Sequence, residues 1–255
     1  DSRCGGPACT GTPEFCTSSR RSASSGPGLP CGDAPPGWVA VATLVAAVAA
    51  WEWGALMGLS QVSRIVMALG ASVVCTVVSV IVPAALGIEG DFVAAAWSLG
   101  FWFYIPAALF WLFVVPCWMY RRWQLPKNVG GLLVGAVVIL PTWLALIQLR
   151  QAGAMVLLAI MAVVWLADIG AYVFGRSFGR HKLAPSISPG KTWEGAIGGG
   201  LVVVVYGLSL FYLVPGSFAV HVAALPVILV LLTIISVVGD LFESMRKRQA
   251  GIKDS

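Results

Sequence analysis

The residues best suited to carry chemistry include carboxylates near the end of the last apolar segment. Asp240 ends that segment, and Asp254 follows in a polar stretch that also holds several Lys and Arg residues. Mg²⁺ prefers oxygen ligands and commonly combines one or two carboxylates with substrate phosphates. The two aspartates therefore predict a divalent metal site beside cations that bind phosphates. A plainer alternative is a basic anchor for anionic lipid headgroups.

A basic loop lies between two earlier apolar segments. Its candidate binding residues are Arg176, Arg180, Lys182, Ser188, Lys191 and Thr192. Residues 189–192 spell Pro-Gly-Lys-Thr at the mouth of a predicted helix, where backbone N–H groups and the helix dipole favour anions. The GxxxxGK[ST] context of a P-loop is absent. We interpret the segment as a phosphate-binding loop, with an ordinary loop that fixes membrane topology as the alternative.

The composition requires these candidates to be held by a membrane scaffold. Hydrophobic residues make up 58% of the 255-residue chain and charged residues 11%, whereas a soluble domain carries roughly 25% charged residues. The net charge of +5 comes from short clusters between apolar segments and not from one patch, which argues against a nucleic-acid partner. An ionisable residue inside such a segment, as Asp168 is, costs about 2.5 kcal/mol or more and so needs a partner or a function.

The apolar segments predict an all-α, polytopic integral membrane protein with about seven transmembrane helices. A helix needs ~20 apolar residues to cross the bilayer core. The expected spans are 38–59, 64–86, 92–119, 129–149, 153–175, 195–214 and 219–240. The third is overlong, and Pro106 and Pro116 predict a kink or a tilt within one span. Residues 1–37 are rich in Gly, Ser and Pro, and we expect a disordered, non-native leader there, followed by one transmembrane domain over 38–255.

Seven spans place alternate loops on opposite sides of the membrane. Most of the 16 Lys and Arg residues then fall on the side that holds the loop at 176–191 and the end of the chain. The positive-inside rule makes that side cytoplasmic. If the last helix continues past its apolar part, one of its faces carries Asp240, Glu243, Ser244 and Lys247, because these residues are spaced by three, four and seven positions from Asp240.

These motifs resemble those of the bacterial phosphatidate cytidylyltransferases, also called CDP-diacylglycerol synthases. The resemblance covers about 38–255 and is most specific in 168–255. The family signature begins S-x-[LIVMF]-K-R-x4-K-D. This sequence supplies Ser244, Lys247, Arg248, Lys253 and Asp254 at that spacing.

The resemblance implies that CTP and phosphatidate react to CDP-diacylglycerol and pyrophosphate, with Mg²⁺ as cofactor and a second cation left open. It further implies a multi-pass protein of the inner (plasma) membrane with a cytoplasmic active face, surrounding lipids as partners, and a homodimer. The implied catalytic residues are Asp240, Lys247, Arg248, Lys253 and Asp254. The implied substrate-binding residues are Arg176, Arg180, Lys182, Ser188, Lys191, Thr192 and Ser244. The implied metal ligands are Asp240, Asp168 and Asp254.

Three departures from the family pattern affect these expectations. Arg246 stands where the signature asks for an apolar residue, and the sequence ends at Ser255, before the signature's His-Gly-Gly and Asp-Arg-x-Asp part. The first family helix is replaced by the leader. We therefore expect a chain truncated at both ends, and one that is inactive or crippled, because only one of the family's two metal aspartates has a match.

Two other functions remain open at this point. A CTP-dependent polyprenol or phytol kinase would share metal and phosphate groups, but we do not expect it to carry the motif at 244–254. An ion-coupled transporter would use its intramembrane carboxylates to bind ions. Against a transporter, the sequence has no convincing internal repeat, and its charges gather at one face.

Overall fold

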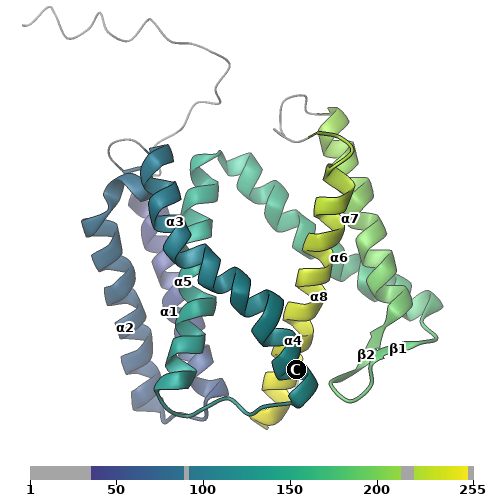
Figure 1. Ribbon diagram of the computed structural model, residues 1–255, viewed down its shortest axis with the longest axis horizontal. Coiled ribbons are helices and arrows are strands. Elements are labelled where there is room, and N and C mark those ends of the chain that lie inside the picture. Colours follow the sequence, from purple (N-terminus) through teal and green to yellow (C-terminus); the bar gives the residue numbers. More distant parts are fainter. Residues whose placement is uncertain (1–35, 89–91, 214–220, 252–255) are drawn as a thin grey trace, which may run out of the picture. The chain divides into compact units, whose positions relative to one another are not determined.

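The computed structural model describes residues 36–88, 92–213 and 221–251 (Figure 1). In that part, seven helical spans are long and apolar enough to cross a membrane, which confirms the predicted all-α, polytopic fold. Six spans are single helices: α1 (Pro36–Leu56), α2 (Gln61–Ile81), α5 (Val129–Gln151), α6 (Ala154–Phe178), α7 (Trp193–Leu213) and α8 (Leu225–Gln249). A short 3-10 turn, η2 (Pro83–Leu86), follows α2. The predicted leader lies outside the described residues except for its last two, which begin α1.

The third span is one bent path, as the two prolines predicted. It consists of α3 (Phe92–Leu109), a π-helical turn η3 (Phe110–Val114) and α4 (Val115–Arg121). Pro106 lies inside α3 and Pro116 lies in the first turn of α4. A proline removes a backbone donor and crowds the preceding turn, and the wider π-turn accommodates the resulting mismatch.

The helices pack around two apolar clusters. The larger one joins α1, α5, η2 and the α3–α4 path, and it takes in Phe242 and Met245 from α8. The smaller one lies among α6, α7 and α8 and contains Ala167, Val203 and Leu229. Many large apolar side chains outside these clusters are exposed, and α2 is exposed over most of its length. Lipid covers such surfaces in a membrane protein, so this exposure agrees with the predicted spans.

The contact between α6 and α7 is unusually close because glycines line it. A Cβ on Gly199 of α7 would lie 2.6 Å from the carbonyl oxygen of Ala167, and one on Gly195 would lie 2.7 Å from that of Ala171. Small residues let two membrane helices approach backbone to backbone. This crossing brings the start of α7 against the end of α6.

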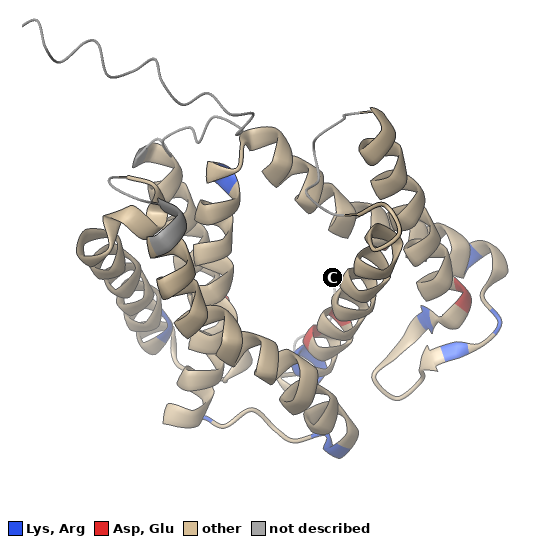
Figure 2. Cartoon of the chain, turned by 45° about the horizontal axis from the view of Figure 1, so that its top comes forward, with Lys and Arg blue, Asp and Glu red and all other residues tan. Residues whose placement is uncertain are grey.

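Two elements differ from the expected bounds. The last helix continues to Gln249, well past Asp240, where the span was expected to end. The basic loop is also not a plain loop, since β1 (Lys182–Ala184) and β2 (Ser188–Thr192) pair in an antiparallel hairpin. The hairpin, the α1–α2 and α4–α5 connections and the end of α8 all lie at the same end of the helices (Figure 1). Most of the charged residues of the described part gather there (Figure 2).

Candidate active site

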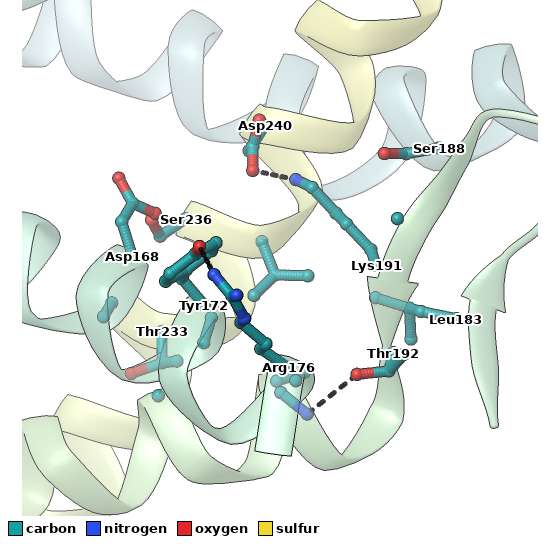
Figure 3. A pocket seen from close by; sticks show the side chains of 18 residues that line it. Asp168, Tyr172, Arg176, Leu183, Ser188, Lys191, Thr192, Thr233, Ser236 and Asp240 are labelled. Carbon is teal, nitrogen blue, oxygen red and sulfur yellow. Dashed lines mark hydrogen bonds and ion pairs between the residues drawn. The ribbon is translucent and has the colours of Figure 1, made fainter. Parts of the chain in front are cut away.

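A pocket of about 460 Å³ lies among α6, α7, α8 and the hairpin, at the end of the helices where the charged residues gather. One part of its lining is made of small and apolar residues such as Ala167, Gly199 and Val237. Its polar wall holds Asp168, Tyr172, Arg176, Ser188, Lys191, Thr192, Thr233, Ser236 and Asp240 (Figure 3). The pocket therefore combines acidic, basic and hydroxyl groups with an apolar wall.

An ion pair between the hairpin and α8 crosses this pocket. Lys191 Nζ, on β2, contacts Asp240 Oδ2, on α8 (Figure 3). The Lys191 side chain is 25% exposed and that of Asp240 is 50% exposed. Burial lowers the pKa of Lys191, and the charges of Asp168 and Glu243 act against that shift. Lys191 is thus a partly desolvated ammonium facing carboxylates, a setting in which an added phosphate would gain strongly.

Helix α6 contributes three polar side chains spaced by one turn. Asp168, Tyr172 and Arg176 follow one another at intervals of four residues and all line the pocket. Arg176 Nη1 donates a hydrogen bond of 2.7 Å to the Tyr172 hydroxyl. Residues four apart lie above one another on a helix. The α6 face therefore presents a carboxylate at one level and a guanidinium two turns closer to the hairpin.

Thr192 links the hairpin to α7. Its Oγ1 accepts the backbone N–H of Gly195 at 3.2 Å, and the residue is 6% exposed. This is the geometry of an N-cap, in which a hydroxyl satisfies a free N–H of the first helical turn. Its hydroxyl hydrogen is still able to donate toward the pocket that Thr192 lines. Thr192 fixes where β2 ends, and so where Lys191 stands.

The structure brings six of the predicted site residues together and leaves others outside. Those that line the pocket are Asp168, Arg176, Ser188, Lys191, Thr192 and Asp240. Those that do not line it are Arg180, Lys182, Ser244, Lys247 and Arg248. Lys247 instead pairs with Glu243 at 2.8 Å. Lys253 and Asp254 lie outside the described residues, so their predicted roles stay predictions.

Three polar residues of the pocket were missed from the sequence, namely Tyr172, Thr233 and Ser236. Helical spacing could have found them. Tyr172 lies midway between Asp168 and Arg176, and Thr233 and Ser236 precede Asp240 by seven and four residues. These intervals place each on the same helix face as the acid beside it.

The donors present fit a hard divalent cation. Asp168 and Asp240 offer carboxylate oxygens and Ser188 and Ser236 offer hydroxyl oxygens around one pocket, which is the ligand set that Mg²⁺ prefers. The ammonium of Lys191 already stands against Asp240, so this carboxylate attracts positive charge. Within the described ranges, no three His, Cys, Asp or Glu residues form a metal cluster of their own. The site thus suits an ion that is coordinated partly by these side chains and partly by a bound phosphate.

Fold and pocket together define an integral membrane protein with a cationic, carboxylate-bearing site at one end of its helices. Comparison with known proteins gives the family. The model of the cytidylyltransferase family matches residues 34–255, and the chain belongs to that family.

Individual relatives match over shorter stretches. The phosphatidate cytidylyltransferase of Pseudomonas aeruginosa is 44% identical over 126 residues, which are 48% of this chain and 45% of that protein. That of Brucella suis is 52% identical over 98 residues, 38% of this chain and 34% of that protein. That of Staphylococcus haemolyticus is 42% identical over 106 residues, 42% of this chain and 40% of that protein. The matches thus span less than half the length of these relatives. No solved structure matches the chain.

Proposed function

We propose that this chain carries the active site of a phosphatidate cytidylyltransferase. In the reaction, an oxygen of the phosphatidate phosphate attacks the α-phosphorus of CTP. The bond from that phosphorus to the bridging oxygen of the β-phosphate breaks, and pyrophosphate leaves with the electron pair. The products are CDP-diacylglycerol and pyrophosphate. The proposal rests on family membership and on the names of the relatives.

One observation supports this reaction above others. A single pocket combines cations and carboxylates at the charged end of the helices with an apolar wall of transmembrane residues. The cations and carboxylates suit a water-soluble nucleoside triphosphate and its metal, and the apolar wall suits the acyl chains of a lipid. A soluble nucleotidyltransferase would have no use for the apolar wall.

The residues of the pocket suit positioning and charge neutralisation better than proton transfer. A phosphate monoester is already ionised near neutral pH, so the attacking oxygen needs no strong base. Arg176 and Lys191 would hold phosphate oxygens, and Ser188, Ser236 and Thr192 would donate hydrogen bonds. Holding both phosphates in line removes much of the entropic barrier, and fixed positive charge stabilises the charge that develops on pyrophosphate.

Mg²⁺ is part of the proposal. Asp240 and Asp168 would hold it, with Asp254 as a further predicted ligand and a second cation left open. Bound there, Mg²⁺ would neutralise the triphosphate and polarise the α-phosphorus. Lys191, whose ammonium contacts the Asp240 carboxylate, would hold a phosphate oxygen beside this site.

The charge distribution supports the setting in the cell that we propose. The end that bears the hairpin carries most of the Lys and Arg of the described part, so the positive-inside rule favours a cytoplasmic active face in the inner (plasma) membrane. Phosphatidate would enter sideways from the cytoplasmic leaflet and CTP from the cytoplasm. A homodimer, with neighbouring lipids as further partners, completes the proposal.

The test uses CTP labelled with ³²P at either the α or the γ position. Membranes carrying the chain, alone and extended by the rest of the family signature, receive phosphatidate and Mg²⁺. Cytidylyl transfer moves the α label into lipid and releases the γ label as pyrophosphate. Lipid labelled from the γ position would instead identify a kinase, and no lipid labelling from either form of the chain would contradict the proposal.

Asp240→Asn should lower kcat/KM by about a hundredfold or more in whichever form is active, because it removes a charge that holds the proposed metal and faces Lys191. Glu52→Gln is the matched acid-to-amide control, since Glu52 lies on α1 and does not line the pocket. Its activity should stay within about threefold of the unchanged protein. Equal losses in both variants would show that Asp240 has no special role.

A further inference from the structure

A side-chain clamp outside the pocket closes the base of the β1–β2 hairpin. Glu194, in the first turn of α7, accepts the backbone N–H of His181 at 3.2 Å on each of its carboxylate oxygens. His181 Nδ1 lies 2.7 Å from Glu194 Oε1. A carboxylate can only accept, so Nδ1 carries the hydrogen. Trp193 N–H donates to the His181 carbonyl at 3.0 Å, which completes the closure.

The clamp lies where the hairpin needs support. His181 directly precedes β1, and Glu194 lies two residues after the end of β2. The two strands have three and five residues, with an irregular register between Lys182 and Ala184. A two-stranded ribbon of this length is marginal in water by itself. The strands carry Ser188 and Lys191 into the pocket. Whatever fixes the hairpin base therefore fixes the reach of Lys191 toward Asp240.

Neither member of the clamp is placed to touch substrate. His181 and Glu194 do not line the pocket, and the His181 side chain is 80% exposed. A catalytic base or a metal ligand would have to face the space where the phosphates lie. The pair therefore acts through the hairpin.

We infer that His181 and Glu194 form a positioning clamp that holds Lys191 in place for binding the phosphates of CTP. The inference rests on the proposed function for the identity of the ligand. It predicts a specific kinetic pattern: releasing the hairpin raises KM for CTP and Kd for pyrophosphate by a larger factor than it lowers kcat. Replacing a catalytic base or a metal ligand would instead lower kcat by a larger factor than it raises KM.

The experiment compares His181→Ala, Glu194→Ala and the double variant, each in the membrane-embedded protein. Each single change should raise Kd for inorganic pyrophosphate by about tenfold, as for the loss of a hydrogen bond to a charged group. Glu194→Ala also removes the bonds to the His181 backbone N–H, so it should be at least as severe as His181→Ala, and the double variant should be no worse than Glu194→Ala. Glu194→Gln should recover most of the affinity, because its amide oxygen still accepts from His181. Ser186→Ala, in the turn of the hairpin, is the control and should change nothing.

Trypsin provides a readout that does not depend on activity. Arg180, Lys182 and Lys191 flank the clamp, and cleavage there should speed up in His181→Ala and Glu194→Ala but not in Ser186→Ala. Faster cleavage with unchanged pyrophosphate affinity would overturn the positioning role. Additive losses, or a Glu194→Gln variant as poor as Glu194→Ala, would overturn the clamp itself. A protein whose affinity for pyrophosphate depends on His181 and Glu194 but which never labels lipid would leave the inference standing and refute the proposed function.

Discussion

Arg246 is a charged side chain with only 2% of its surface exposed. Its guanidinium lies between two rings, 4.7 Å from the Trp118 centroid and 4.9 Å from that of Phe242. Nη2 donates to the Trp123 carbonyl at 2.8 Å, and Nε and Nη1 have no hydrogen-bond partner in the described part of the chain. The alternative of a lipid anchor at the basic end does not apply to this residue, because its side chain is buried. The family pattern's apolar residue at this position agrees with that burial.

The contacts of Arg246 predict a structural role at the junction of α4 and α8. Arg246→Ala should cost about 2–4 kcal/mol, because it removes a hydrogen bond and two cation–π contacts and leaves a cavity. The measurement is the apparent Tm of the purified protein in detergent. Arg248→Ala, whose side chain is exposed two residues away, should leave Tm nearly unchanged. A similar Tm for both variants would show that the aromatic sandwich contributes little.

At the scale of elements, the close crossing of α6 and α7 sets the width of the pocket. Gly199→Ala should separate the two helices, because the new Cβ would lie 2.6 Å from a backbone oxygen that cannot move aside. We expect a lower Tm and weaker pyrophosphate binding, even though alanine favours helix over glycine by about 1 kcal/mol.

The neighbouring glycine provides the control for this change. A Cβ on Gly200 would meet Thr233 Cγ2 at 3.7 Å, which is ordinary contact. Gly200→Ala gains the same helix propensity without the clash, so its Tm should be equal to or above that of the unchanged protein. If Gly199→Ala and Gly200→Ala have the same Tm and the same affinity for pyrophosphate, the α6–α7 contact does not set the width of the pocket.

How far the elements could be predicted depends on the range of the forces involved. The seven spans follow from runs of apolar residues, which are a local property, and the structure confirms them to within a few residues at most ends. The hairpin could not be foreseen, because residues 182–192 contain Pro185 and Pro189 and lack the alternation typical of strands. The contact between His181 and Glu194 at its base and the cap made by Thr192 join residues that no local strand pattern marks.

The same reasoning explains which site residues were foreseen. Asp168, Arg176 and Asp240 stood out because charge is rare in apolar runs. Ser244, Lys247 and Arg248 matched a motif, yet they point along faces of α8 that do not line the pocket. A motif gives residue types in order along the chain. Only the crossing of α6, α7 and α8 decides which of them meet.

At the scale of the whole molecule, the distribution of charge predicts the orientation in the membrane. The hairpin lies at the basic end, and the α5–α6 connection lies at the opposite end (Figure 1). Single cysteines at Ser186 and at Ala152 would report on the two ends, since both residues are exposed. The background would have its six native cysteines replaced by serine.

In intact cells, a membrane-impermeant maleimide should label Ala152→Cys and leave Ser186→Cys unlabelled until the membrane is permeabilised. The physical reason is that loops rich in Lys and Arg are retained on the cytoplasmic side during insertion. Labelling of Ser186→Cys in intact cells would put the pocket on the outside, where CTP is absent, and would remove the basis for a cytidylyl transfer there. Labelling of both positions only after permeabilisation would show that the two ends do not face opposite sides. The expected pattern would place Lys191 and Asp240 within reach of cytoplasmic nucleotide and of lipid in the same leaflet.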